Sequence, residues 1–202
     1  PFLAVTGVVL WLRRMLRGAS TAPKGPKDAE AVVLVGSETG STWPFAQSLA
    51  RALEAAGKSA LVTSMNDGIE HLFGHDRDVY ILAASYGAGE APASANRFLS
   101  LLDRRTDRVS ARVHVLGFGD RSFAQFCGFA ADVHSGVEAR SECVPSYAEI
   151  DRQSGQSFEN WGRTLGFELK HQSQRQKTRA FTLLEAQRMG TEVAAPVSHL
   201  VF

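Results

Sequence analysis

Cysteine is scarce in this 202-residue chain, which argues against a disulfide scaffold and against a zinc site. Cys127 and Cys143 are the only two cysteines, too few to cross-link a domain of this size, which favours a reducing compartment. Neither has a partner at the spacing of a zinc site, so we expect no metal centre. The sequence also contains no acid/base pair or nucleophile triad, so we predict no catalytic side chains.

Excess positive charge is missing from the middle of the chain. Residues 31–170 carry thirteen Lys and Arg against seventeen Asp and Glu, whereas residues 1–30 carry five against two and residues 171–202 four against two. A nucleic-acid-binding domain concentrates basic residues where it meets phosphates. The distribution therefore argues against a nucleic-acid partner.

The chain also lacks an apolar run as long as a membrane span. Residues 2–12, FLAVTGVVLWL, are eleven uncharged residues, where a spanning helix needs about 20. They end in Trp11 and Leu12 and are followed by Arg13 and Arg14, as at the cytoplasmic end of a membrane helix. We therefore expect residues 1–17 to be the end of a truncated transmembrane helix with its basic flank. The alternative is an amphipathic or buried helix of the soluble fold. Residues 18–30 are expected to be a linker.

The body of the chain, residues 31–170, alternates apolar runs with helical patterns. Strands are predicted over 32–35, 58–63, 78–84, 112–118 and 144–150, with helices over 44–56 and 67–73, around 98–102, through 126–137 and around 158–165. This alternation predicts an α/β fold with a doubly wound parallel sheet of five strands. Ligands bind such sheets beyond the carboxyl ends of the strands, so the loops after the first, third and fourth strands should form the site.

These three loops are rich in glycine, hydroxyls and single aromatic residues. Residues 37–42, SETGST, offer hydroxyls and amides just before a helix, which favours an anion. The loop has no lysine and matches neither nucleotide-binding glycine motif, so a phosphate would be held and not transferred. Tyr86 and Phe123 in the other two loops could sandwich a flat ring whose phosphate tail reaches the first loop.

The motifs GSETGS, ASYGAGEAP and VLGFGDRSFAQFC resemble, in order and spacing, the three flavin-contacting segments of the flavodoxin-like FMN domain of diflavin reductases. That family includes the sulfite reductase flavoprotein and the microsomal cytochrome reductases. The resemblance covers about residues 31–170 and implies the flavodoxin-like strand order 2-1-3-4-5.

The resemblance also implies roles for individual residues. Tyr86 would stack on one face of the flavin and Phe123 on the other, and Gly87 would turn its peptide toward N5 on reduction. Ser85 and Gly89 would shape that loop. The FMN phosphate would be held by Ser37, Thr39, Gly40, Ser41 and Thr42, with Glu38 contributing its backbone. The ring and ribityl chain would be approached by Phe118, Gly119, Asp120, Phe126 and Cys127, with Asp151 as a weaker candidate.

Three positions depart from the family pattern. Phe123 stands where a tyrosine is usual, which removes a hydroxyl hydrogen bond. Ala88 replaces a common acidic residue, and the helix after the first strand opens with Trp43 and Pro44.

The ends of the chain carry weaker resemblances. PVSHLVF resembles the start of a ferredoxin-reductase-type FAD domain, so residues 180–202 would begin a truncated second domain after a basic connector at 171–179. Two strand-like pieces, residues 181–186 and 197–202, could instead form an edge hairpin of the first domain. The apolar start resembles bacterial reductases that join a PepSY transmembrane region to a diflavin reductase.

Together these features predict the FMN-binding electron-transfer domain of a membrane-anchored NADPH-dependent diflavin oxidoreductase, incomplete as an enzyme by itself. Its location would be the cytoplasmic side of the cell inner membrane. FAD and NADPH would bind a missing C-terminal part, and the acceptor would be a haem, an iron centre or a ferric chelate. Two alternatives stay open: a flavin-free module for docking or for sensing a phosphorylated ligand, and a flavodoxin-type quinone reductase.

Overall fold

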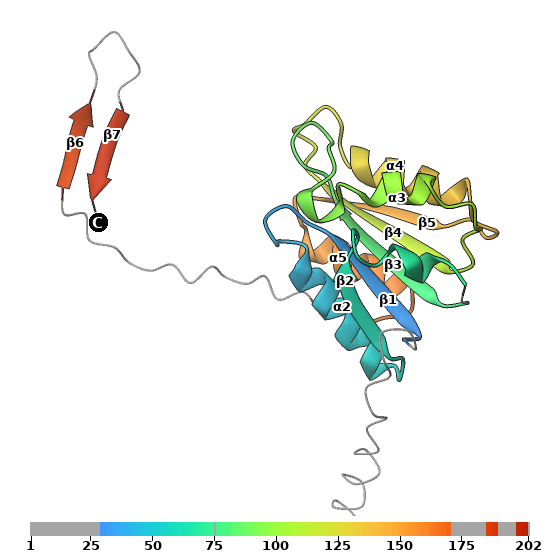
Figure 1. Ribbon diagram of the computed structural model, residues 1–202. Helices are drawn as coiled ribbons and strands as arrows, with labels where there is room; N and C mark the ends of the chain where they lie inside the picture. The colour runs from blue at the N-terminus through green and yellow to red at the C-terminus, as the bar shows by residue number, and fades with distance from the viewer. Residues whose placement is uncertain (1–28, 75, 171–184, 190–196, 202) are drawn as a thin grey trace, which may run out of the picture. The chain divides into compact units, whose positions relative to one another are not determined.

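Residues 29–170 form a five-stranded parallel sheet with helices on both faces (Figure 1). The computed structural model describes residues 29–74 and 76–170, and the backbone of residues 185–189 and 197–201. The strands lie in the order β2-β1-β3-β4-β5, and every neighbouring pair is parallel, as predicted. Their bounds are β1 (Ala31–Gly36), β2 (Ala60–Ser64), β3 (Asp78–Ala84), β4 (Arg112–Gly119) and β5 (Ser146–Asp151).

Two pairs of helices cover the two faces of the sheet. Helices α2 (Trp43–Ala55) and α5 (Gly155–Thr164) pack on one face, and α3 (Phe98–Asp103) and α4 (Gly128–Glu138) on the other. The second face also receives two short 3-10 helices, η2 (Ile69–Leu72) and η3 (Ala93–Ala95). Each face therefore has its own apolar core.

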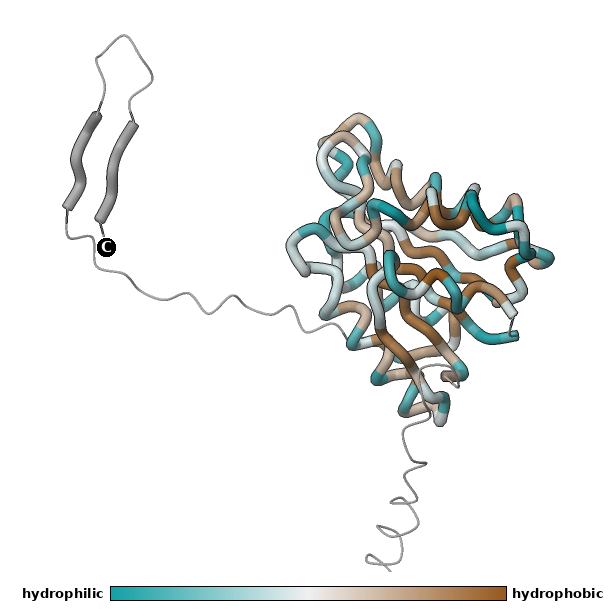
Figure 2. Tube along the Cα trace, in the orientation of Figure 1, coloured by the Kyte–Doolittle hydropathy of each residue, from teal (hydrophilic) through white to brown (hydrophobic). Residues whose placement is uncertain are grey.

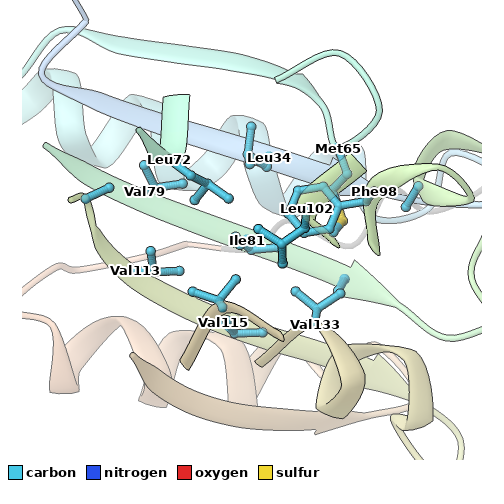
Figure 3. Close-up of a cluster of buried hydrophobic side chains, with 14 of the residues drawn as sticks. Leu34, Met65, Leu72, Val79, Ile81, Phe98, Leu102, Val113, Val115 and Val133 are labelled. Atoms are coloured by element: carbon cyan, nitrogen blue, oxygen red, sulfur yellow. The ribbon is translucent and has the colours of Figure 1, made fainter. Parts of the chain in front are cut away.

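The central strands supply both cores from alternate residues. Val32 and Leu34 of β1 belong to the core under α3 and α4, and Val33 and Val35 to the core under α2 and α5. Because both faces are covered, β1 is a continuous apolar run without alternation, visible as a brown strand in Figure 2. Figure 3 shows the first core around Ile81. Burying each such side chain contributes about 1.5–3 kcal/mol to the stability of the fold. The two cores therefore fix the strands and, with them, the positions of the strand ends.

Several element boundaries differ from the prediction by one or two residues, among them those of α4, β5 and η2. Helix α4 begins at Gly128, so Phe126 precedes it, because Cys127 has left-handed backbone with φ 54° that a helix cannot contain. Strand β5 begins at Ser146, and Val144 is 81% exposed before Pro145, which has no N–H to donate to the sheet. The helix predicted over residues 67–73 is the four-residue 3-10 helix η2.

Residues 172–202 form a separate compact unit. Its strands β6 (Glu185–Met189) and β7 (Val197–Val201) pair antiparallel in a two-stranded sheet of their own. The second predicted strand matches β7, whereas the prediction over 181–186 overlaps β6 only at its first two residues. The predictions for residues 1–28 and for the connector at 171–179 lie outside the described residues. Within the described part, no helix has both the length and the apolarity to cross a membrane.

Candidate cofactor-binding site

A cleft of about 690 Å³ opens at the carboxyl edge of the sheet, where the parallel strands end. Its walls come from the loops after β1, β3, β4 and β5. The volume lies in the range of small-molecule sites. Within the described residues, no group of three or more His, Cys, Asp or Glu could hold a metal ion.

The loop between β1 and α2 contributes Glu38, Thr39 and Ser41 to the cleft wall. The amides of Glu38, Thr39, Gly40 and Ser41 donate no hydrogen bond to any described residue, and Gly40 supports the turn with φ 85°. These four amides precede the N-terminus of the thirteen-residue helix α2. Free amides and the positive end of a helix dipole together form an anion-binding site.

Ser37 and Thr42 lie beneath this loop and not in its wall. Ser37 is 4% exposed, and its hydroxyl accepts a hydrogen bond from the Thr42 amide at 3.3 Å. Thr42 is 1% exposed, and its hydroxyl oxygen has no hydrogen-bond partner among the described residues. It also makes no side-chain cap to α2. Since a buried hydroxyl is costly without a partner, this one indicates a missing polar ligand at the loop.

Two aromatic rings from two other loops also line the cleft. Tyr86 follows β3 and Phe123 follows β4, and each lines the cleft while remaining 54% exposed. Large apolar side chains are normally covered, so two of them beside one cleft indicate a surface that packs against a ligand.

The Tyr86 loop is a tight turn. The backbones of Tyr86 and Glu90 exchange two hydrogen bonds, at 2.9 and 2.7 Å, which leaves three residues at the tip. Gly87 and Gly89 have φ of 52° and 101°, values that residues with a Cβ rarely adopt. A Cβ on Gly89 would lie 2.7 Å from the Cβ of Gln125, so this loop also rests directly on the loop after β4. Next to this turn, the buried Ser85 hydroxyl has no partner among the described residues.

Besides Phe123 and Gln125, the loop after β4 contributes its backbone and one fixed carboxylate to the cleft. A Cβ on Gly119 would lie 2.8 Å from the Cys127 amide nitrogen, so only glycine fits at the end of β4. Hydrogen bonds from the Ser122 hydroxyl and amide, with a weaker contribution from Arg152, lower the pKa of Asp120 to about 2. Asp120 is therefore ionised at any physiological pH.

The turn after β5 forms hydrogen bonds to the loop after β4 and to the loop after β1. Arg152 donates through Nε to Asp120 Oδ1 at 3.1 Å, and Gln153 donates through Nε2 to Ser41 Oγ at 2.8 Å. Both residues line the cleft and have left-handed backbone, with φ of 48° and 56°. Such backbone is costly in residues with a Cβ, and it is typical of functional sites.

The structure brings most of the predicted site residues into the cleft wall. Six predicted residues are not part of the wall: Ser37, Gly40 and Thr42 in the first loop, and Phe126, Cys127 and Asp151. The other eleven line it: Glu38, Thr39, Ser41, Ser85, Tyr86, Gly87, Gly89, Phe118, Gly119, Asp120 and Phe123.

The other three residues outside the wall, Phe126, Cys127 and Asp151, contact the loop after β4 or the end of that strand. The Phe126 ring packs under the Arg121 guanidinium, 4.4 Å from its carbon, and Asp151 Oδ1 accepts from the Arg121 amide at 3.0 Å. Cys127 is fully buried, and burial together with Glu149 raises the pKa of its thiol to about 12. The thiol therefore stays protonated and is not a nucleophile.

Sequence reasoning missed five lining residues: Ala84, Pro92, Gln125, Arg152 and Gln153. Arg152 and Gln153 were predictable, because β5 is parallel to the other strands and its following loop therefore lies at the same edge of the sheet.

Comparison with known proteins agrees with this geometry. The family model described as flavodoxin matches residues 33–161. The chain is 31% identical over 121 residues to the sulfite reductase (NADPH) flavoprotein alpha-component of Thiocapsa roseopersicina, a match that covers 57% of this chain and 23% of that protein. It is 34% identical over 105 residues to NADPH-dependent diflavin oxidoreductase 1 of Schizosaccharomyces pombe, covering 50% of this chain and 18% of that protein. The chain thus spans less than a quarter of these curated relatives.

Solved structures support the fold. The crystal structure of oxidised flavodoxin 2 from Bacillus cereus superimposes with a TM-score of 0.56 at 21% identity, covering 67% of this chain and 94% of that one. The family match spans most of residues 29–170, including all three glycine-rich loops. The chain therefore belongs to the flavodoxin family.

Proposed function

We propose that residues 29–170 bind FMN and transfer electrons as one domain of a longer flavoprotein oxidoreductase. The observation that carries this proposal is a single cleft lined both by the loop that carries four free amides before α2 and by two exposed aromatic rings, Tyr86 and Phe123. Membership of the flavodoxin family and the names of the relatives, an NADPH-dependent flavoprotein and a diflavin oxidoreductase, support it.

The loop after β1 suits a phosphate monoester. The amides of Glu38–Ser41 and the hydroxyls of Thr39 and Ser41 can donate to phosphate oxygens, and the α2 dipole favours the charge. This loop contains no lysine or arginine. A group held by neutral donors is bound without the charge compensation that phosphoryl transfer requires.

The other end of the cleft suits a flat ring. Tyr86 and Phe123 can cover two ring faces, and Gly87 and Gly119 allow the backbone to come close to a ring edge. FMN supplies the redox chemistry, and the protein supplies binding, orientation and exclusion of water. Asp120, ionised and fixed by Ser122 and Arg152, adds a constant charge at this end.

In the longer protein, we propose that electrons pass from NADPH through an FAD domain to this FMN domain and on to a haem, iron centre or ferric chelate. The relatives' names, which include NADPH and diflavin, and the PVSHLVF segment support the part of this route from NADPH to FMN. The acceptor is proposed from the resemblance alone. Anchoring at the cytoplasmic side of the inner membrane is part of the proposal and rests on the sequence of residues 1–17 alone.

Titration of the purified chain with flavins tests the proposal. We expect FMN to bind at one site per chain, and riboflavin, which lacks the phosphate, to bind at least ~10-fold more weakly, because charge-assisted hydrogen bonds are lost. Quenching of flavin fluorescence by the two stacked rings reports binding. FAD serves as the matched control, because its diphosphate and adenosine must extend beyond a loop suited to a monoester.

Two results would refute it. Absence of FMN binding would favour the flavin-free module for docking or phospholigand sensing. Equal affinity for FMN and riboflavin would show that the loop after β1 does not hold a phosphate. Quinone reduction by the chain with NADPH alone would instead favour the flavodoxin-type quinone reductase.

A further inference from the structure

The loop after β1 is held by a serine from a distant part of the chain. Ser94 lies in η3, 57 positions beyond Ser37. Its hydroxyl accepts a hydrogen bond from the Ser37 amide at 2.7 Å and donates one to the Ser37 carbonyl at 2.9 Å. One hydroxyl thereby satisfies both backbone groups of the residue that begins the loop.

A second contact joins the neighbouring residues. The Ala93 amide donates to Oε2 of Glu38 at 2.7 Å. Two consecutive residues of η3 therefore hold two consecutive residues of the loop. The free amides begin at this point and run from Glu38 to Ser41.

The η3 turn is itself fixed from its other side by Asn66, in the loop after β2. The Asn66 amide donates to the Ser94 carbonyl at 3.1 Å, and its side-chain nitrogen donates to the Ala93 carbonyl at 3.0 Å. The end of β1 also comes very close, because a Cβ on Gly36 would lie 3.2 Å from the Cβ of Ala95. Ser94 is therefore a rigid support and not a mobile surface group.

We propose that Ser94 is a positioning residue for the phosphate end of bound FMN, acting through Ser37. Ser94 fixes the chain direction where the loop begins, and the Ser37 hydroxyl fixes the Thr42 amide where it ends, at 3.3 Å. The four free amides between these points are thereby held in one orientation. This inference rests on the proposed FMN function and adds a residue outside the cleft wall to it.

The same short segment joins the two ends of the cleft. Tyr86 begins the turn that leads through Glu90 to Pro92, which lines the cleft and directly precedes η3. Removing the Ser94 hydroxyl leaves this turn closed by its own Tyr86 and Glu90 hydrogen bonds. The phosphate end should therefore lose its support while the ring end keeps its geometry.

Ser94→Ala separates these two effects when it is titrated with FMN and with riboflavin. We expect the affinity for FMN to fall about 5- to 10-fold, because the Ser37 amide and carbonyl lose their partner and the loop relaxes. The affinity for riboflavin should change less than ~2-fold, since it makes no phosphate contact. Ser94→Thr, which keeps the hydroxyl, should restore the preference for FMN.

Ser100→Ala is the matched control, because Ser100 is an exposed residue of α3 outside the cleft, and its hydroxyl donates to the Arg97 carbonyl. An equal loss for both flavins would overturn the proposal, since Ser94 would then support the whole fold only. Unchanged FMN affinity in Ser94→Ala would also overturn it. If the parent chain binds no FMN, the proposed function fails and this inference fails with it.

Folding of each variant is checked by thermal unfolding. Should Ser94→Ala not fold, Ser94→Cys and Ser94→Thr decide the matter, because sulfur is a weak hydrogen-bonding group and the threonine hydroxyl is not. The proposal requires the ratio of FMN to riboflavin affinity to fall in the cysteine variant and to hold in the threonine variant. The proposal is overturned if this ratio stays unchanged in the cysteine variant or falls in the threonine variant.

Discussion

The two edges of the sheet use their polar groups in opposite ways. At the amino edge, Asp78 begins β3 and is only 6% exposed, and each of its oxygens has its own cation. Lys58 Nζ lies 2.6 Å from Oδ2, and Arg112 Nε lies 2.8 Å from Oδ1. Beside them, Tyr80 stacks on His114 at 4.9 Å, and burial raises the pKa of Tyr80 to about 12. The protein itself therefore satisfies this buried carboxylate.

The carboxyl edge leaves comparable groups unsatisfied. Four amides and the buried hydroxyls of Thr42 and Ser85 have no partner among the described residues, and two aromatic rings are half exposed. Arg152 and Gln153 keep left-handed backbone here. We infer that the amino edge serves stability and the carboxyl edge serves binding. Changes at the two edges should therefore separate these two properties.

Removing the aromatic rings should have the largest effect, and on binding alone. Tyr86→Ala and Phe123→Ala should each lower FMN affinity about 10- to 100-fold, because stacking on an aromatic side chain contributes about 1–3 kcal/mol. The melting temperature should change little, since both side chains are 54% exposed. Flavin fluorescence titration and thermal unfolding measure the two properties.

Val144→Ala is the control, because Val144 is a large apolar side chain that is exposed outside the cleft. It should alter neither property. If both ring variants kept the FMN affinity of the parent chain, the flavin ring would have to bind elsewhere.

Most of the fold was predictable because strands and helices leave hydrophobic patterns among residues that are adjacent in the sequence. The run at residues 78–84 matches β3 at both ends, since a strand covered on both faces must be apolar throughout. Tyr86 and Phe123 were found because each follows such a run by a few residues. Periodicity predicted less well where one residue has unusual backbone, as Cys127 does before α4.

The supporting contacts of the site were not predictable, because they join distant segments. Ser94 meets Ser37 across 57 positions, and Gln153 meets Ser41 across 112. Nothing in the local sequence around Ser94 distinguishes its hydroxyl from that of any turn serine. Such residues are recognised only after the sheet has brought the strand ends together.

Neutralising Asp78 tests the amino edge. Asp78→Asn should lower the free energy of unfolding by about 1–3 kcal/mol, because two charge-assisted hydrogen bonds are weakened at a buried site. FMN affinity should stay within ~2-fold of the parent value, since the change lies at the opposite edge from the cleft. Denaturant unfolding and flavin titration report the two properties, and a large loss of affinity would contradict the separation of the edges.

The pH dependence of stability also tests whether the Asp78 carboxylate stabilises the fold, and it needs no ligand. Burial raises the pKa of Asp78, but the hydrogen bonds and charges of Lys58 and Arg112 outweigh it, so the pKa lies below the ordinary 3.8. The stabilisation from this carboxylate is therefore present above about pH 4 and is lost as pH falls through its folded pKa. Asp78→Asn should flatten the decline of stability below that pH, and an unchanged slope would show that other carboxylates cause it.

Removing the strain of the left-handed backbone at the carboxyl edge should have the smallest effect. It should raise the stability of the fold and lower the affinity for FMN. Arg152→Gly should raise the melting temperature by about 1–4 °C, because glycine adopts φ near 48° without a Cβ clash. The ion pair that it removes is exposed and contributes little to stability. FMN affinity should fall about 2- to 5-fold, since the freed turn fixes Asp120 and the cleft wall less firmly.

Arg163→Gly is an instructive counterpart, because Arg163 lies within helix α5, where glycine is unfavourable. It should lower the melting temperature and leave FMN affinity unchanged, the reverse of Arg152→Gly in both respects. A fall in both properties for Arg152→Gly would mean that the turn after β5 stabilises the fold as the amino edge does. The contrast between the two edges would then hold for the loops after β1, β3 and β4 only.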